Sequence, residues 1–183
     1  MAETVASPAS ILVFWREAGP ERWFKAAPAI DALVRECFLT TYEAAAAGRL
    51  ANWEASAEDA LALVIVLDQF PRNMFRGTAR AFATDAQARD VARRAIERGF
   101  DRKIAMHERT FFYLPFEHSE ELTDQEQSLA LFESTGDAES VKWAQIHLDV
   151  IRRFGRFPHR NQVLGRGSTP EEIAFLEGGG FRA

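Results

Sequence analysis

Helix start and stop signals recur along the whole chain, and they constrain the fold more than any other feature. Ser7 precedes Pro8, and Gly19 lies where the first helix should stop. Ser56 and Asp59 form the spacing of a capping box ahead of a long apolar run. The predicted helices are residues 8–18, 28–47, 57–70, 85–98, 101–114, 124–135, 138–154 and 170–177.

Two prolines mark predicted helix ends. Pro71 follows the apolar run and Pro115 follows an aromatic one, and proline disrupts the interior of a helix. We therefore expect the chain to turn sharply at Pro71 while Phe70 stays in the core. Two further helices are predicted to start at capping boxes, formed by Thr84 with Gln87 and by Thr123 with Glu126.

No segment favours a strand, and most predicted connections are short. Residues 60–67 are apolar enough for a buried strand, but their length and caps favour a buried helix. The sequence predicts a single all-α domain over residues 1–183, with about eight helices packed as antiparallel pairs. Residues 1–7 and 178–183 are predicted to be frayed tails.

Charge and cysteine content narrow the class of protein. The net charge of −5 argues against a nucleic-acid-binding protein. A lone cysteine, Cys37, indicates a reducing compartment, and its spacing from Val34 predicts a core position. The apolar run at residues 11–15 is too short for a signal peptide, and no run approaches the length of a membrane span. We therefore predict a cytoplasmic protein with no membrane partner; its oligomeric state is not readable from the sequence.

The chain contains the same unusual pattern twice. Residues 67–78 read LDQFPRNMFRGT and residues 157–169 read FPHRNQVLGRGST, so Phe-Pro and Arg-Asn recur before an Arg-Gly turn. We call residues 68–77 the first elbow and residues 155–166 the second elbow. The hypothesis is that both elbows direct polar side chains into one shared cleft. The predicted ligand-binding residues are Arg72, Asn73, Arg76, His118, His147, Arg156, His159, Arg160 and Asn161.

Ordinary helix capping gives an alternative explanation of the elbows. Arginine satisfies free carbonyls at a helix end, and asparagine caps a helix start. Asp68 lies in the last turn of its helix, so Arg72 or Arg76 is expected beside it. Thr169 and Glu172 are explained better by capping of the last helix than by an anion site. On this reading the elbows are internal braces.

Histidines and the PFEHSE segment supply the candidate catalytic groups. His147 lies on or beside an apolar helical stripe, and His118 follows Glu117 in a loop anchored by Phe116. We consider His118 or His147 as a general base oriented by Glu117. Glu120 and Glu121 are predicted to be solvated acids before a helix. The sequence predicts no cofactor; the residues for a divalent metal, if one binds, are His118, His147, His159 and Glu117.

Three long strings carry a family resemblance. They are LDQFPRNMFRGTARAFATDAQA, FFYLPFEHSEELTDQ and RFGRFPHRNQVLGRGSTPEEIAFL, in that order along the chain. They resemble the bacterial domain-of-unknown-function family 924, and the resemblance covers nearly the whole chain. It implies an all-α fold similar to tetratricopeptide-like helical repeats, and it brings no established reaction, substrate or cofactor.

Three functions remain open at this stage. The first is a pocket formed by the FPRN, PFEHSE and FPHRN segments, which binds a small anionic molecule or a peptide end. The second is an enzyme that uses a His/Glu acid–base pair, or a histidine-bound metal, in that pocket. The third is a helical-repeat scaffold whose groove takes a peptide.

Overall fold

The computed structural model describes residues 4–25 and 27–181, which form helices and connecting turns without a strand. The described chain divides into two compact units, residues 1–112 and 113–183, and α6 (Met106–Glu117) runs across their boundary. The fold is all-α, as predicted. The tetratricopeptide-like arrangement and the single domain stay predictions. So do the frayed tails, of which residues 1–3 and 182–183 lie outside the described part.

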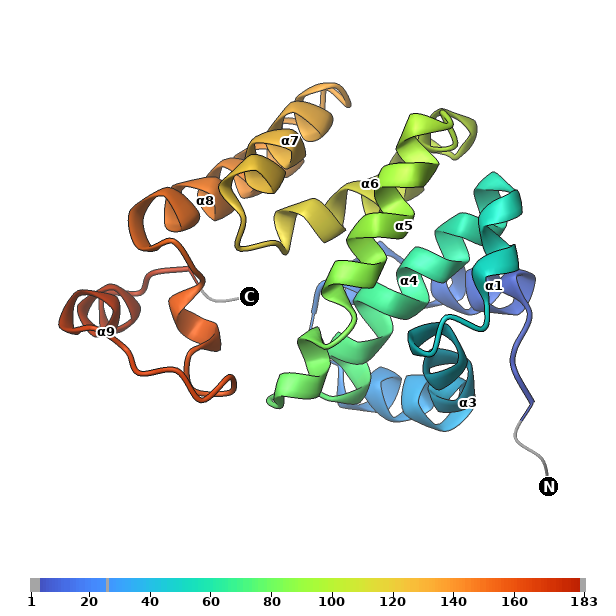
Figure 1. Ribbon diagram of the computed structural model, residues 1–183, viewed down its shortest axis with the longest axis horizontal. Helices are drawn as coiled ribbons and strands as arrows, with labels where there is room; N and C mark the ends of the chain where they lie inside the picture. The colour runs from blue at the N-terminus through green and yellow to red at the C-terminus, as the bar shows by residue number, and fades with distance from the viewer. Residues whose placement is uncertain (1–3, 26, 182–183) are drawn as a thin grey trace. The chain divides into compact units, whose positions relative to one another are not determined.

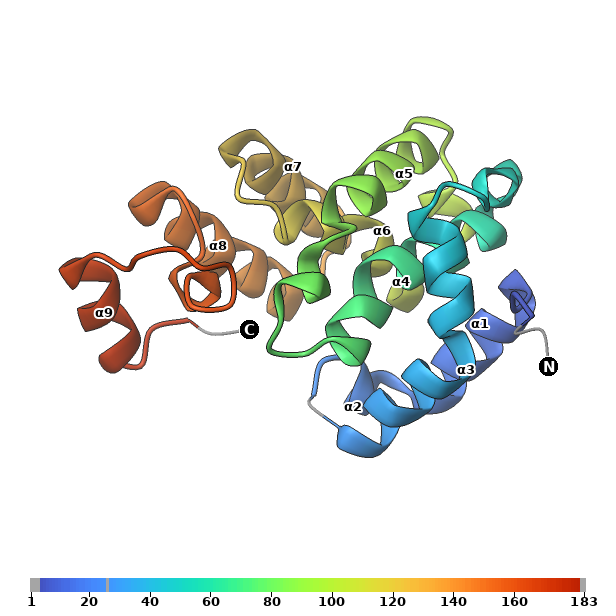
Figure 2. The same cartoon turned by 60° about the horizontal axis from the view of Figure 1, so that its bottom comes forward.

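The N-terminal unit is built around α4 (Ala57–Met74), which packs against α3, α5, α1 and two short 3-10 helices (Figures 1 and 2). Every residue of α4 from Ala60 to Pro71 is buried, as expected for a helix apolar on all sides. The other elements are α1 (Pro8–Ala18), α2 (Pro20–Trp23), α3 (Pro28–Ala46), η1 (Ala51–Ala55), η2 (Ala79–Phe82), α5 (Asp85–Glu97) and η3 (Asp101–Lys103).

Aromatic rings form the centre of this unit. Phe70 of α4 is fully buried, with its ring centroid 5.1 Å from Phe38 and 5.8 Å from Trp15. Phe111 of α6 lies 5.7 Å from Trp15 and 5.0 Å from Trp23. Such pairs add roughly 0.5–1.5 kcal/mol each beyond the area they bury. Phe70 is therefore a core residue, as the sequence predicts.

The C-terminal unit contains α7 (Leu122–Glu133), α8 (Ala138–Phe154), η4 (Pro158–Arg160) and α9 (Pro170–Glu177). α7 and α8 lie side by side, joined by a short turn (Figure 1). Val150, Ile151 and Phe157 form a core cluster against which Phe154, Phe175 and Phe181 pack. Gly155 ends α8 in the left-handed conformation, with φ of 68°, and its N–H donates to Ile151 O. This is the cap expected from its position.

Pro71 does not end its helix, contrary to the sequence prediction. It lies inside α4, which continues to Met74, so Phe70 keeps helical geometry. A proline leaves the carbonyl four residues earlier without its helical donor. Here that carbonyl is Leu67 O, and it accepts a hydrogen bond of 2.6 Å from Thr84 Oγ1. The same contact explains why Thr84 makes no side-chain cap for α5.

Three other local predictions are wrong. Pro115 lies inside α6, which continues to Glu117. Thr123 lies within α7 rather than before it, because the helix begins at Leu122 with Glu121 as its N-cap. Cys37 is exposed. The apolar face of α3 runs through Val34, Phe38, Thr41 and Tyr42, and Cys37 lies outside it.

None of the helices in the described residues is long and apolar enough to cross a bilayer. The cytoplasmic location stays a prediction.

Candidate functional site

The first elbow lies in the N-terminal unit and is organised around a buried carboxylate. Asp68 is fully buried, and Arg72 Nη1 lies 3.3 Å from its Oδ1. The same guanidinium forms two hydrogen bonds to Asp85, of 2.8 and 3.0 Å. Burial lowers the pKa of Arg72, but the charges of Asp68 and Asp85 outweigh it and raise that pKa overall. The positive partner expected beside Asp68 is therefore Arg72.

The two other predicted ligand-binding residues of the first elbow share one carboxylate. Asn73 Nδ2 donates to Asp31 Oδ1 at 2.7 Å, and Arg76 donates to both Asp31 oxygens at 3.0 and 3.1 Å. Asp31 lies in the first turn of α3, where a negative charge is favourable. The first elbow thus ties the end of α4 to the start of α3.

The second elbow, in the C-terminal unit, repeats this arrangement. Arg156 donates to both oxygens of Glu172 at 2.6 and 2.9 Å, and Asn161 Nδ2 donates to Glu172 Oε2 at 3.1 Å. Glu172 lies in the first turn of α9 and completes the capping box with Thr169. Arg156 is the largest cause of the lowered pKa of Glu172, about 2. In both elbows an asparagine and an arginine converge on a first-turn carboxylate.

A second carboxylate fixes the base of this elbow. Glu120 accepts two hydrogen bonds from Arg166, of 2.6 and 2.9 Å, and one of 2.8 Å from Phe157 N. Partial burial raises the pKa of Glu120, but Arg166 and the Phe157 amide outweigh it and lower that pKa overall. Arg166 also donates to Asn161 Oδ1 at 3.0 Å. Glu120 is therefore a half-buried brace and not a freely solvated acid.

The other candidate residues of this unit are linked to one another, and three of them contact Phe157. We call Glu117, His118, His147, His159 and Arg160 the imidazole cluster. The rings of His147 and His159 lie 5.7 and 5.6 Å from the Phe157 ring, and the Arg160 guanidinium lies 4.5 Å above it. Arg160 Nη1 donates to His118 O at 2.9 Å. Segments separated by about 30 residues of sequence thus meet in one place.

His147 is buried and held by two oxygens. Its Nδ1 lies 2.8 Å from Trp143 O and 3.2 Å from Glu117 Oε1. Because a carbonyl oxygen only accepts, Nδ1 carries the proton and Nε2 holds the lone pair. Burial is the largest cause of the lowered pKa of His147, which is about 3; the Trp143 carbonyl opposes it, and the nearby His118, Arg160 and His159 add to it. His147 is therefore neutral near pH 7.

The predicted site residues therefore fall into two groups, one in each unit. Arg72, Asn73 and Arg76 lie in the N-terminal unit. His118, His147, Arg156, His159, Arg160 and Asn161 lie in the C-terminal unit with Glu117. The convergence of the two elbows on one cleft stays a prediction. Within residues 4–25 and 27–181, no group of three or more His, Cys, Asp or Glu side chains is placed to hold a metal ion.

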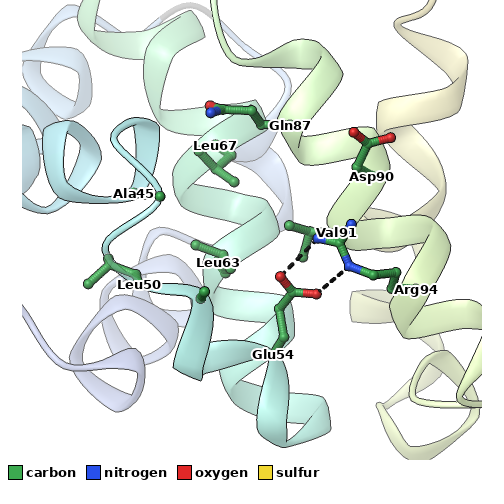
Figure 3. Close-up of a pocket in the computed structure, with 11 residues that line it drawn as sticks. Ala45, Leu50, Glu54, Leu63, Leu67, Gln87, Asp90, Val91 and Arg94 are labelled. Atoms are coloured by element: carbon green, nitrogen blue, oxygen red, sulfur yellow. Dashed lines mark hydrogen bonds and ion pairs between the residues drawn. The ribbon is translucent and has the colours of Figure 1, made fainter.

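The N-terminal unit also contains a small cavity that the sequence did not predict. Its volume is ≈ 160 Å³, and an ion pair of Glu54 with Arg94, at 2.7 and 2.8 Å, lies at its edge (Figure 3). Leu63 and Leu67 of α4 line its apolar side. These residue types are ordinary for helix packing, so no sequence signal distinguishes them.

Comparisons with known proteins place the chain in a family. Residues 11–180 match the family described as "Bacterial protein of unknown function (DUF924)". A solved structure of a protein of unknown function from Agrobacterium tumefaciens is similar, with a TM-score of 0.91 and 44% sequence identity. The match covers 93% of this chain and 97% of that one. No curated protein matches. The three motifs that carried the resemblance all lie within the matched residues, and the chain belongs to this bacterial family of unknown function.

Proposed function

We propose that the C-terminal unit binds a small ligand with an anionic group at the imidazole cluster. One observation carries this proposal: the rings of His147 and His159 and a buried arginine, Arg160, contact a single phenylalanine ring, and Arg160 also binds the backbone of His118. His118 and His159 are partly exposed, whereas His147 and Arg160 are buried. A ligand that approaches from the exposed histidines would meet a fixed guanidinium behind them.

The electrostatics of the cluster favour an anion. Arg160 carries a positive charge, and Arg160, His118 and His159 each disfavour a positive charge on His147. A guanidinium binds carboxylate and phosphate groups through paired hydrogen bonds, which are strongest where water is excluded.

The two elbows have different roles in this proposal. Arg160 and His159 supply the ligand contacts, while Arg156 and Asn161 hold the second elbow in shape through Glu172. The three candidates of the first elbow are engaged with Asp31 and Asp85 in their own unit. A direct role for them would require these contacts to open.

Titration of the four histidines by NMR tests the proposal. We expect propionate or inorganic phosphate to shift the imidazole signals of His118, His147 and His159 saturably. His107, which stacks on Trp23 in the N-terminal unit, is the internal reference. Propylamine, with the opposite charge, should produce no shift. Arg160→Gln should weaken propionate binding about tenfold or more, the cost of roughly 1.5–3 kcal/mol for a charged hydrogen bond.

A matched variant keeps this test specific. Arg153→Gln removes an exposed arginine of the same unit, whose partner Glu171 is also exposed, and should leave propionate binding unchanged. Equal weakening in the Arg153 and Arg160 variants would reduce the effect to net charge and contradict the proposal. So would shifts of His107 that match those of the cluster.

One observation favours an acid–base enzyme as a second candidate function. The Glu117 carboxylate contacts the same His147 nitrogen that carries the proton, which leaves Nε2 as the proton acceptor. Glu117→Gln tests this arrangement. If Glu117 orients the ring, the variant should change the tautomer of His147, which the ¹⁵N chemical shifts of its two nitrogens report. An unchanged tautomer would mean that Trp143 O alone sets the ring and would remove the support for an acid–base pair.

A further inference from the structure

An aromatic side chain from the end of the described chain packs into the imidazole cluster. The Phe181 ring lies 4.3 Å from the His147 ring and 5.5 Å from the His159 ring, measured between centroids. It lies 6.2 Å from Phe157, which is the ring that Arg160 covers. Phe181 is partly exposed, although two of the rings that it contacts, those of His147 and Phe157, belong to buried residues. It therefore closes the side of the cluster that His147 and His159 form.

Glycines after α9 allow Phe181 to reach this position. Gly179 has φ of 80°, which disfavours any residue with a side chain. Gly180 N donates to Phe175 O at 2.8 Å, and a Cβ atom at residue 180 would lie 2.5 Å from that oxygen and 2.7 Å from the Phe175 ring. Since that oxygen belongs to the backbone, it cannot move aside cheaply. The turn that brings Phe181 to the imidazoles thus requires glycine at residue 180.

The hydrogen bonds of this turn remain local. The N–H groups of Gly178, Gly179 and Gly180 donate to Ala174, Leu176 and Phe175, all within α9. The contacts of Phe181 with the cluster are ring contacts. A ring of similar size that also bears a negative charge would make these contacts and reach Arg160 as well.

We propose that Phe181 occupies the subsite for the aromatic ring of the ligand, so the ligand is an aryl carboxylate that displaces it. This inference rests on the proposed function and adds the class of compound: a single aromatic ring joined by a short chain to a carboxylate. The ring takes the place of Phe181 between His147 and His159. The carboxylate binds Arg160, which stacks on the same Phe157 ring that Phe181 faces.

Two variants separate displacement of Phe181 from other effects. Gly180→Ala forces Phe181 out of the cluster and leaves every side chain of the subsite in place. Gly167→Ala is the matched control, because an added Cβ there meets nothing within 4 Å. The probes are 3-phenylpropionate, propionate and phenethylamine, with binding measured by titration of the histidine signals.

For the wild-type protein we expect 3-phenylpropionate to bind about tenfold more tightly than propionate, since burying a ring adds roughly 1.5 kcal/mol or more. Phenethylamine, which has the ring but the opposite charge, should not bind. Gly180→Ala should tighten 3-phenylpropionate binding several-fold, because Phe181 no longer occupies the subsite and so no longer competes with the ring of the ligand. Propionate binding in Gly180→Ala, and both anions in Gly167→Ala, should match the wild type.

The outcomes distinguish the inference from the proposed function. If propionate shifts the cluster histidines but 3-phenylpropionate binds no more tightly, the aromatic subsite is wrong and anion binding stands. If Gly180→Ala leaves the preference for 3-phenylpropionate unchanged, displacement of Phe181 is wrong. If neither anion shifts the histidine signals of the cluster, the proposed function fails as well.

Should Gly180→Ala not fold, the wild-type protein labelled with 4-fluorophenylalanine at residue 181 gives the same answer. Saturating 3-phenylpropionate must move its ¹⁹F signal toward that of an exposed ring, and an unmoved signal overturns displacement.

Discussion

Replacing Arg72 with alanine should lower the free energy of unfolding by about 3–5 kcal/mol, the usual cost of breaking a buried ion pair from one side. The guanidinium is 19% exposed, and the side chain of Asp68, with which it pairs, is 1% exposed. The variant leaves that carboxylate buried without its cation and also removes the link to Asp85. Urea unfolding followed by circular dichroism near pH 7 measures the effect.

Arg76→Ala is the control for this prediction. Its guanidinium is 49% exposed and pairs with Asp31, so its loss should cost about 1 kcal/mol or less. If the free energy of unfolding falls strongly in Arg72→Ala and only slightly in Arg76→Ala, Arg72 is a structural brace within the N-terminal unit. A loss below about 1 kcal/mol at residue 72 would contradict that reading and restore Arg72 as a ligand-binding candidate.

Acidification should destabilise the protein through His147. The pKa of this residue is about 3 in the folded protein, against an ordinary value near 6.5. Between these values only the unfolded state binds the proton, so the stabilisation is complete above about pH 6.5 and is lost as the pH falls. From pH 7 to about pH 4.5 the loss should be roughly 3 kcal/mol, because each pH unit below about 6.5 costs about 1.4 kcal/mol.

A variant assigns this loss to one residue. His147→Gln keeps a side-chain hydrogen-bond donor but does not titrate, so its unfolding free energy should fall much less over the same range. Glu172, with a pKa of about 2, loses its stabilisation only below about pH 4.5, outside the measured range. Equal slopes in the wild type and in His147→Gln would show that His147 titrates normally when folded.

Helix positions were largely predictable because their signals are local. Ser7, Ser56 and Thr169 cap their helices as the sequence indicates, through contacts that span three residues. The error at Pro71 has a non-local cause. Pro71 leaves the Leu67 carbonyl without its helical donor, and Thr84, which is 17 residues away, donates to that carbonyl instead. No local pattern reveals this contact.

The candidate site was predictable only in part, for the same reason. The repeated Arg-Asn pattern is visible in the sequence, but the carboxylates that it binds, Asp31 and Glu172, look like ordinary first-turn acids. Glu120 likewise resembles a solvated acid until Arg166, 46 residues later, is placed beside it. The predicted tail at residues 178–183 includes Phe181, because a run of glycines usually indicates a loose end. Its contact with His147 depends on a tertiary turn at Gly180.

Glu172 joins structures that would otherwise move separately. One carboxylate binds Arg156 and Asn161 of the second elbow, caps α9 through the Thr169 amide, and thereby fixes the helix from which Phe181 extends. Loss of the contacts of this carboxylate would release the second elbow, the start of α9 and the segment that carries Phe181 together. Residues 156–181 should therefore open as one cooperative segment, with their slowest amide protons exchanging at a common rate, and not fray residue by residue.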